Sequence, residues 1–167
     1  TVTVPAYSAT PYSITVTNDG NGNASADKTS AVAGETVTLT ATPNTGYVFD
    51  KWDDKTPTSL TIDTDGKFNM PGENVSVKAI FKGAALIGTA SITGTLKYGQ
   101  ELTATLNGGN NTGTLTYKWY RSGETAEIET NTSGKYTLVA ADIDKTITVE
   151  ITSDVQSGKI TSSATGT

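Results

Sequence analysis

The sequence predicts an all-β fold built from two tandem small antiparallel β modules. Thr, a β-branched residue that favours strands, makes up about a fifth of the chain, which is well above its ordinary usage. Apolar and polar residues alternate with a period of two in many short segments, and glycine-containing turns separate these segments. Apolar residues at helical spacing persist nowhere for more than about two turns, so we expect the core to be formed by strands.

The residue types that the chain lacks exclude most common enzyme mechanisms. It contains no Cys and no His, so it has no thiolate nucleophile, no Ser-His-Asp triad and no imidazole metal ligand. We therefore expect no enzymatic activity, no cofactor and no bound metal. The net charge of -5, with Lys and Arg scattered singly, argues against nucleic-acid binding. Apolar runs fall short of the length that spans a membrane, so no membrane insertion is expected.

The N-terminal segment, residues 1–11, is predicted to be a tail or linker. Pro5 and Pro11 would interrupt a central strand in this segment. Because the chain begins at Thr1 without an initiator Met, we expect it to be a processed or excised piece of a longer protein.

Residues 12–83 form the first predicted module. Its alternating segments place a set of side chains in the core: Ile14, Val16, Val37, Leu39, Ala41, Val75, Val77, Ala79 and Phe81. A hairpin is expected in which segment 59–63 pairs with segment 67–71, so that Leu60 and Ile62 face Phe68 and Met70.

Residues 84–167 form the second predicted module, and the boundary is expected near Gly83. Seven short alternating segments surround an inward Trp119, which lies on the third of them. This arrangement is the pattern of an immunoglobulin-like sandwich. In the last segment, Ser162 and Ala164 are predicted to point inward.

Three stretches of the first module carry a family resemblance. They read YSITVTNDGNGNASAD, AGETVTLTATPNTGYVFDKW and FNMPGENVSVKAIF. Through these stretches, residues 12–82 resemble a divergent internalin-B-type B-repeat of bacterial surface proteins.

The second module resembles a different family. Over residues 85–167 the chain is similar to a bacterial Ig-like repeat of cell-surface proteins, through LIGTASITGTLKYGQELTA, LTYKWYRSG and YTLVAADIDKTITVEIT. That family usually has Gly after the Asp turn, where this chain has Asp144, so we expect Asp144 to adopt a left-handed conformation. Together the two resemblances imply a secreted or wall-attached bacterial protein whose repeats serve as stalks, spacers or adhesin parts without a catalytic residue set.

One turn of the first module imitates the start of a calcium loop. Oxygen-bearing side chains occupy alternate positions from Asp19 to Asn23, as they do in such loops. The sixth position is Ala24 and the twelfth is Ser30, where the loop requires Gly and Glu. A plain hairpin turn explains the segment better, and the same holds for Asp63–Gly66, so no metal ligand is assigned.

The remaining charged residues are predicted to face water. The acids lie mainly in turns, on strand faces expected to contact water or at sheet edges, and none falls inside an apolar pattern that would raise its pKa. A pair of glycosidase carboxylates is therefore not expected. Every Lys is also placed in a turn or on a wet face, so a Lys–Asn isopeptide cross-link, which needs a buried Lys beside a buried acid, is not expected either.

The aromatic residues supply the candidate binding residue. Alternation predicts core packing, rather than sugar stacking, for most members of one set: Tyr47, Phe49, Trp52, Tyr117 and Trp119. Tyr120 lies on the opposite face of its strand from Trp119 and is the candidate ligand-binding residue. Three further tyrosines complete the pool of aromatics that are expected to be exposed, and they are dispersed in the sequence: Tyr7, Tyr12 and Tyr98.

These observations favour a non-catalytic structural or adhesive spacer segment of a bacterial secreted or cell-surface multi-repeat protein. We expect it to be extracellular and monomeric, with host or cell-wall glycans or proteins as the partner classes left open. The alternative is a carbohydrate-binding accessory module of a large secreted glycoside hydrolase, which would need two or more exposed coplanar aromatics in one groove. A third hypothesis is pairing with another protein through an exposed sheet edge at residues 127–131.

Overall fold

The computed structural model describes residues 9–166 and divides the chain into two compact units. The first module ends at Lys82 and the second begins at Gly83. Strands make up nearly all of the regular structure, so the predicted all-β class is confirmed. Of the predicted tail over residues 1–11, residues 1–8 lie outside the described part, and with them the expected exposure of Tyr7.

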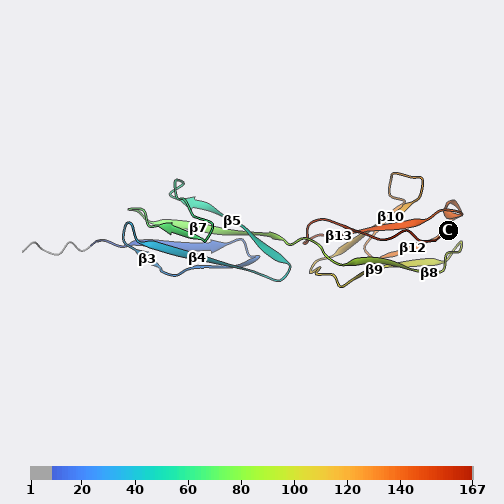
Figure 1. Cartoon of the computed structure of the whole chain (residues 1–167), viewed down its shortest axis with the longest axis horizontal. Helices are drawn as coiled ribbons and strands as arrows, with labels where there is room; N and C mark the ends of the chain where they lie inside the picture. The colour runs from blue at the N-terminus through green and yellow to red at the C-terminus, as the bar shows by residue number, and fades with distance from the viewer. Residues whose placement is uncertain (1–8, 167) are drawn as a thin grey trace, which may run out of the picture. The chain divides into compact units, whose positions relative to one another are not determined.

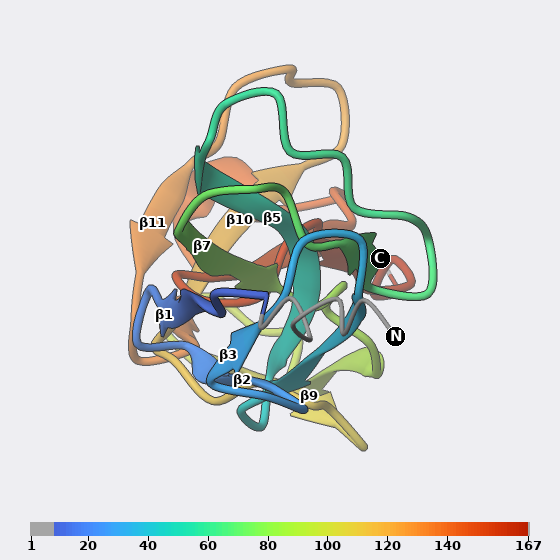
Figure 2. The same ribbon diagram turned by 90° about the vertical axis from the view of Figure 1, so that its left-hand side faces the viewer.

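The first module contains seven strands within its described residues. They are β1 (Tyr12–Asn18), β2 (Gly22–Ala26), β3 (Ser30–Ala31), β4 (Thr36–Pro43), β5 (Tyr47–Thr56), β6 (Lys67–Asn69) and β7 (Val75–Gly83). One sheet has the order β3-β1-β7-β5 and the other has the order β2-β4-β6. In Figure 2, β7 lies between β1 and β5.

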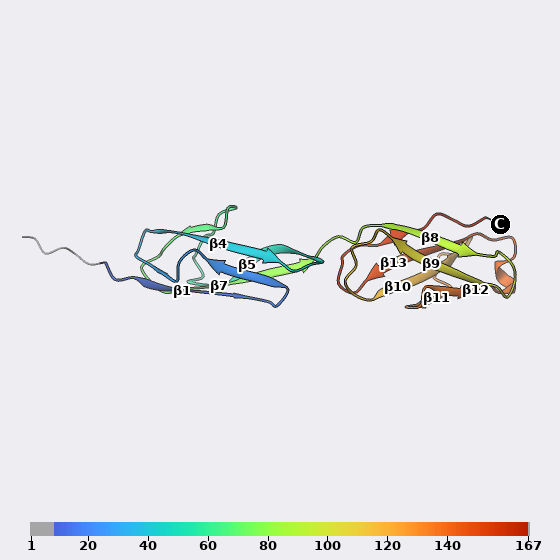
Figure 3. The same cartoon turned by 90° about the horizontal axis from the view of Figure 1, so that it is seen from below.

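The first module contains a parallel pair, which departs from the antiparallel arrangement that was predicted. Its first strand, β1, and its last strand, β7, lie side by side (Figure 3) and are parallel, with Ile14 opposite Val75 and Asn18 opposite Ala79. Parallel neighbours need a crossover, and here the chain passes through the second sheet before β7 returns beside β1.

The core of the first module lies between its two sheets. Val37 on β4 and Val77 on β7 are fully buried, and further buried residues of this core are Ile14, Ala31, Leu39, Leu60, Phe68, Met70 and Val75. The alternation in the sequence therefore predicted the inward faces of β1, β4 and β7 correctly.

The predicted hairpin between segments 59–63 and 67–71 is wrong in its first half. Leu60 is buried as expected, but segment 59–63 forms no strand. The Asp63 carboxylate instead accepts hydrogen bonds from the backbone N–H groups of Asp65 at 2.9 Å and Lys67 at 2.8 Å. Such local side-chain bonds compete with a strand ladder, and they form a turn at this point.

The second module has the predicted sandwich architecture. Within residues 83–166 its strands are β8 (Thr89–Gly94), β9 (Glu101–Asn107), β10 (Leu115–Arg121), β11 (Glu129–Asn131), β12 (Lys135–Thr137), β13 (Ile147–Ser153) and β14 (Ile160–Thr161), and a 3₁₀ helix η1 (Ala140–Asp142) precedes β13. The two sheets have the orders β11-β10-β13-β14 and β12-β9-β8. Figure 1 shows β8 and β9 in one layer and β10 and β13 in the other.

Trp119 lies at the centre of the second core, as the alternation predicted. It is fully buried and stacks on Tyr136 with ring centroids 5.5 Å apart. Its indole Nε1 has no hydrogen-bond partner among the described residues. The predicted inward position is correct for Ser162 and wrong for Ala164, which is exposed. The chain leaves strict alternation there, because the Thr165 hydroxyl accepts the Ile147 N–H at 2.9 Å.

Candidate functional site

Tyr120, the candidate binding residue, is half-buried on the outer face of β10. It lies opposite Thr148 of β13, while the neighbouring Trp119 points into the core. Other tyrosines expected to be exposed do not join it, because Tyr12 packs against the core of the first module and Tyr98 lines a separate cavity. The structure therefore assembles no aromatic platform around Tyr120 within the described residues.

A second aromatic surface lies on β5 of the first module. Phe49 and Trp52 are half-exposed, with ring centroids 5.1 Å apart, and Phe49 also makes an edge contact with the buried Phe81 at 5.9 Å. The predicted core packing is correct for Tyr117 and Trp119, and Trp52 also packs against the core of the first module although it is partly exposed. Tyr47 and Phe49 are likewise only partly buried. These side chains remain partly exposed because β5 is the edge strand of its sheet and has a neighbouring strand on one side only.

These two rings lie in a groove of about 320 Å³, which we call the aromatic groove. It is lined by Leu39, Ala41, Phe49, Lys51, Trp52, Asp63, Thr64, Asp65 and Gly66. Lys51 forms an ion pair with Asp53 at 2.5 Å, and the Asp63 carboxylate stabilises the turn described above. The groove therefore combines partly exposed aromatic rings with a carboxylate at Asp65, a set of groups that suits the apolar faces and hydroxyls of a sugar.

Asp19, in the turn that imitates a calcium loop, has a structural role. One carboxylate oxygen accepts the Asn21 N–H at 3.0 Å, and the other accepts the Phe81 N–H at 2.9 Å. The hydrogen bond from Phe81 is the main cause that lowers the pKa of Asp19. The side chain thus joins the β1–β2 turn to β7, and the described residues contain no cluster of three or more acids that could hold a metal ion.

A buried charged cluster in the second module was not predicted from the sequence. Arg121 and Asp142 are both buried, and Arg121 Nε donates to Asp142 Oδ1 at 2.6 Å. Asp142 Oδ2 accepts from the Tyr136 hydroxyl at 2.9 Å and from the Val139 N–H at 2.7 Å. We call Arg121, Tyr136 and Asp142 the buried ion-pair cluster.

The environment of this cluster holds Asp142 in its ionised form. Burial by itself raises the pKa of Asp142, but hydrogen bonds from Val139, Arg121 and Tyr136 outweigh it, and the pKa is lowered. Burial and the adjacent Asp142 carboxylate raise the pKa of Tyr136 to about 12. A general acid needs a proton to give near neutral pH, so Asp142 is suited to structural support rather than to acid catalysis.

A signal for this cluster was present in the sequence. Arg121 has the same strand parity as Tyr117 and Trp119, which places it on the inward face of β10. Asp142 is an exception among the acids, which were predicted to lie mainly at solvent-exposed positions: it is buried because it pairs with Arg121 of β10, and sequence alternation within one strand does not reveal such a partner.

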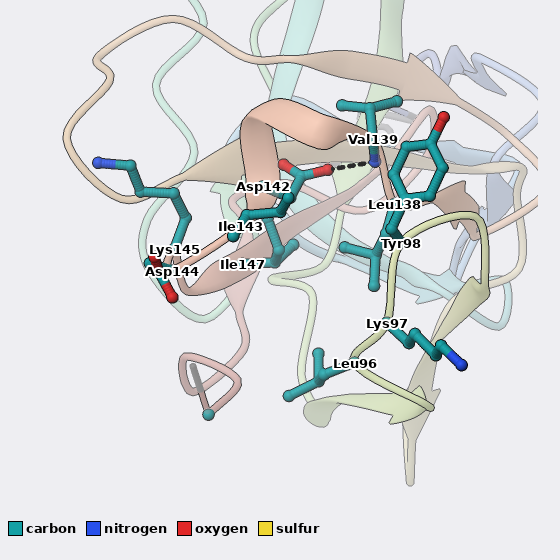
Figure 4. A pocket seen from close by; sticks show the side chains of 11 residues that line it. Leu96, Lys97, Tyr98, Leu138, Val139, Asp142, Ile143, Asp144, Lys145 and Ile147 are labelled. Atoms are coloured by element: carbon teal, nitrogen blue, oxygen red, sulfur yellow. Dashed lines mark hydrogen bonds between the residues drawn. The ribbon is translucent and has the colours of Figure 1, made fainter.

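Beside this cluster a cavity of about 210 Å³ opens at the surface of the second module (Figure 4). Four of the exposed large apolar residues of the chain line it: Leu96, Tyr98, Val139 and Ile143. We call these four residues the apolar end cluster. Figure 4 shows the Asp142 carboxylate bonded to the Val139 N–H, and the charged residues Lys97, Asp144 and Lys145 line the cavity beside the apolar end cluster.

Every Lys in the chain lies in the described part and is exposed or half-buried. The lysines therefore lie at solvent-accessible positions, as expected. Within residues 9–166, no helix has the length and apolar character needed to cross a membrane.

The fold and these sites define a class of small two-sheet β modules joined in one chain. Residues 12–85 match the family model described as the divergent InlB B-repeat domain, and the predicted B-repeat resemblance of the first module is confirmed. Neither a curated protein nor a solved structure matches the chain.

Proposed function

We propose that this chain is a non-catalytic structural or adhesive spacer segment of a bacterial secreted or cell-surface protein. The observation that carries the proposal is the B-repeat match over residues 12–85, because B-repeats belong to surface repeat proteins. A second two-sheet module with its own core follows directly. Folded modules with separate cores extend a chain without needing a ligand.

The chemistry of the charged groups supports the non-catalytic part of this proposal. Asp142 is the buried acid, and it is held ionised by Arg121 and by hydrogen bonds. Asp19 uses both carboxylate oxygens to accept backbone N–H groups. These two acids stabilise the fold, and their lowered pKa values are the opposite of what a general acid near neutral pH requires.

Surface display tests the spacer role. The chain is placed between a wall anchor and an epitope tag on a bacterial cell, and antibody access to the tag is compared with the anchor joined directly to the tag. We expect greater access with the chain present, and greater protease resistance than with a Gly/Ser linker of equal residue number, because such linkers are flexible coils. Equal access with and without the chain would contradict the spacer role.

The aromatic groove favours one alternative function, carbohydrate binding. It brings the partly exposed rings of Phe49 and Trp52 next to Asp65, although the two ring planes are tilted by 54° rather than coplanar. A glycan array probed with the intact chain tests it, with Trp52→Ala and Tyr120→Ala as paired variants. Loss of signal for Trp52→Ala alone would locate binding in the groove, loss for Tyr120→Ala alone would locate it on β10, and a blank array for the intact chain would end the hypothesis.

We also propose that the chain is monomeric. The apolar end cluster consists of four side chains, whereas a stable protein interface buries about 800 Å² on each partner. Sedimentation at increasing protein concentration should show a constant mass of one chain. A mass that rises toward two chains, and that Ile143→Ser restores to one, would instead identify the apolar end cluster as a dimer interface.

A further inference from the structure

The parallel pairing of β1 with β7 determines how the first module responds to mechanical tension. Five consecutive residues of β1, from Ile14 to Asn18, lie in parallel register with five residues of β7, from Val75 to Ala79. Because the strands are parallel, the chain enters β1 at one end of this ladder and leaves β7 at the other. Tension applied to the two ends of the module therefore pulls β1 and β7 in opposite directions along their length.

Side chains extend the β1–β7 ladder at both of its ends. At the start, the Ser13 N–H donates to Asn74 Oδ1 at 2.9 Å. At the other end, Asp19 Oδ2 accepts the Phe81 N–H at 2.9 Å. The inward residues of β7 in this region are almost completely buried, so the core shields one face of the ladder from water, which could otherwise replace its hydrogen bonds.

The direction of load determines how such a ladder fails. Force along the strands loads all the inter-strand hydrogen bonds at once, whereas force across one end of the ladder breaks them one after another. Resistance to forced unfolding is governed by the barrier to unfolding rather than by equilibrium stability. The same ladder should therefore resist load along its strands far better than load that opens it from one end.

The second module has a shorter version of the same arrangement. Its N-terminal segment pairs in parallel with the segment just before β14, through one bridge between Ala85 and Ser157. Leu86 N–H donates to the Ser157 carbonyl at 2.7 Å, and Ser157 N–H donates to the Ala84 carbonyl at 2.9 Å. One bridge replaces the five register pairs of the first module, so the parallel connection has fewer bonds to break under tension, while the C-terminal segment is held by antiparallel pairing of β14 with β13.

We infer that the β1–β7 ladder is a mechanical clamp, and that the chain bears tension with the first module as its more resistant part. The inference extends the spacer function proposed above, since a spacer between an anchor and a bound partner experiences tension, but the clamp itself is a property of the isolated chain. Under tension on the whole chain, the second module unfolds before the first.

Single-molecule pulling of the full chain tests the clamp. The chain has no Cys, so introduced cysteines define the points of attachment without side reactions. The pair Thr10→Cys and Lys82→Cys loads the ladder along its strands. The pair Thr10→Cys and Glu73→Cys attaches both handles at the same end of the ladder and opens it from that end. All three positions are exposed, so both attachments leave the core intact.

We expect first-module unfolding to be at least about tenfold slower with the Thr10 and Lys82 attachment than with the Thr10 and Glu73 attachment at the same force. Equal rates would overturn the clamp. A third pair, Thr10→Cys with Gly166→Cys, reports the order of events, and a first step that releases the length of the first module would overturn the proposed order.

Variants of two aspartates test which hydrogen bonds provide the resistance to forced unfolding. Asp19 accepts the Phe81 N–H across the loaded ladder, whereas Asp27 accepts the Thr38 N–H at 2.9 Å between strands outside it. Asp19→Ala should accelerate unfolding under load along the ladder more than Asp27→Ala, even where the two variants melt at similar temperatures. An equal acceleration by both would contradict the location of the clamp. A chain that fails in surface display but keeps the directional difference would refute the spacer function and leave the clamp in place.

Discussion

At the scale of single residues, Asp142 is the acid whose environment differs most from water. Its carboxylate accepts bonds from Arg121, Tyr136 and the Val139 backbone. These partners come from β10, β12 and the start of η1, so one side chain ties three separate segments together. Removing one member of a buried charged pair leaves the other uncompensated, and this loss costs more than the intact pair contributes to stability.

The first prediction concerns the neutralisation of this carboxylate. Asp142→Asn keeps the size of the side chain but removes the buried counter-charge of the Arg121 guanidinium, whose remaining ion-pair partner is Glu124 at the surface, so we expect the second module to lose up to about 3 kcal/mol of unfolding free energy. Chemical denaturation provides the measurement. Asp144→Asn is the matched control, because Asp144 is exposed with φ 60° and Asn tolerates that conformation. A similar loss in both variants would show that the ion pair is not responsible.

The second prediction is a dependence on acid pH. The pKa of Asp142 is lowered in the folded state from an ordinary value of 3.8, so the ionised form stabilises the fold above that value. This contribution is lost as the pH falls below 3.8 through the folded-state pKa. The stability difference between the native chain and Asp142→Asn should therefore shrink in that range. A difference that stays constant with pH would exclude Asp142 as its source.

At the scale of elements, the contact between the backbone of Gly22 and the ring of Phe81 determines where β2 can lie. A Cβ atom at Gly22 would come within 2.5 Å of the Phe81 ring, so the start of β2 can rest on that ring because residue 22 has no side chain. The sequence shows Gly22 as part of a turn signal, and its contact with β7 becomes visible in the folded structure alone.

The third prediction follows from that contact. Gly22→Ala should destabilise the first module by about 1–3 kcal/mol, the usual cost of overpacking a core. Gly72→Ala is the control, because the nearest atom to its added Cβ is the Tyr12 hydroxyl at 4.0 Å. Thermal melting of both variants is the measurement. If Gly22→Ala melts with the native chain, the Phe81 ring can move aside and the packing argument fails.

Turns show how far sequence reasoning extends at this scale. The left-handed conformation expected at Asp144 is observed, with φ 60°, because the turn type and the tolerance of Asp for it are local properties. The strand expected over segment 59–63 is absent, and the two segments of the predicted hairpin are joined instead at a turn, where the Asp63 carboxylate accepts the N–H groups of Asp65 and Lys67. Alternation in the sequence did not show where side-chain hydrogen bonds replace a strand ladder.

At the scale of the whole molecule, each module has its own core. The buried cluster around Trp119 and the buried cluster around Val37 share no residue. The fourth prediction is that the destabilising effects of Gly22→Ala and Asp142→Asn add in the double variant, because distant sites in separate cores rarely couple. Calorimetry should show each change in a different transition. A single transition that both variants shift would mean that the two modules unfold as one cooperative unit.

The sequence by itself determined the all-β class, the inward faces of β1, β4, β7 and β10, the central Trp119 and the B-repeat resemblance. These features depend on period-two alternation and on turn residues, which are local along the chain. The tertiary structure decided the parallel pairing of β1 with β7, the half-exposed position of Phe49 and Trp52 at a sheet edge, and the ion pair between Arg121 and Asp142. Each of these depends on which distant segments become neighbours, and the pattern within a single strand carries no information about its partner.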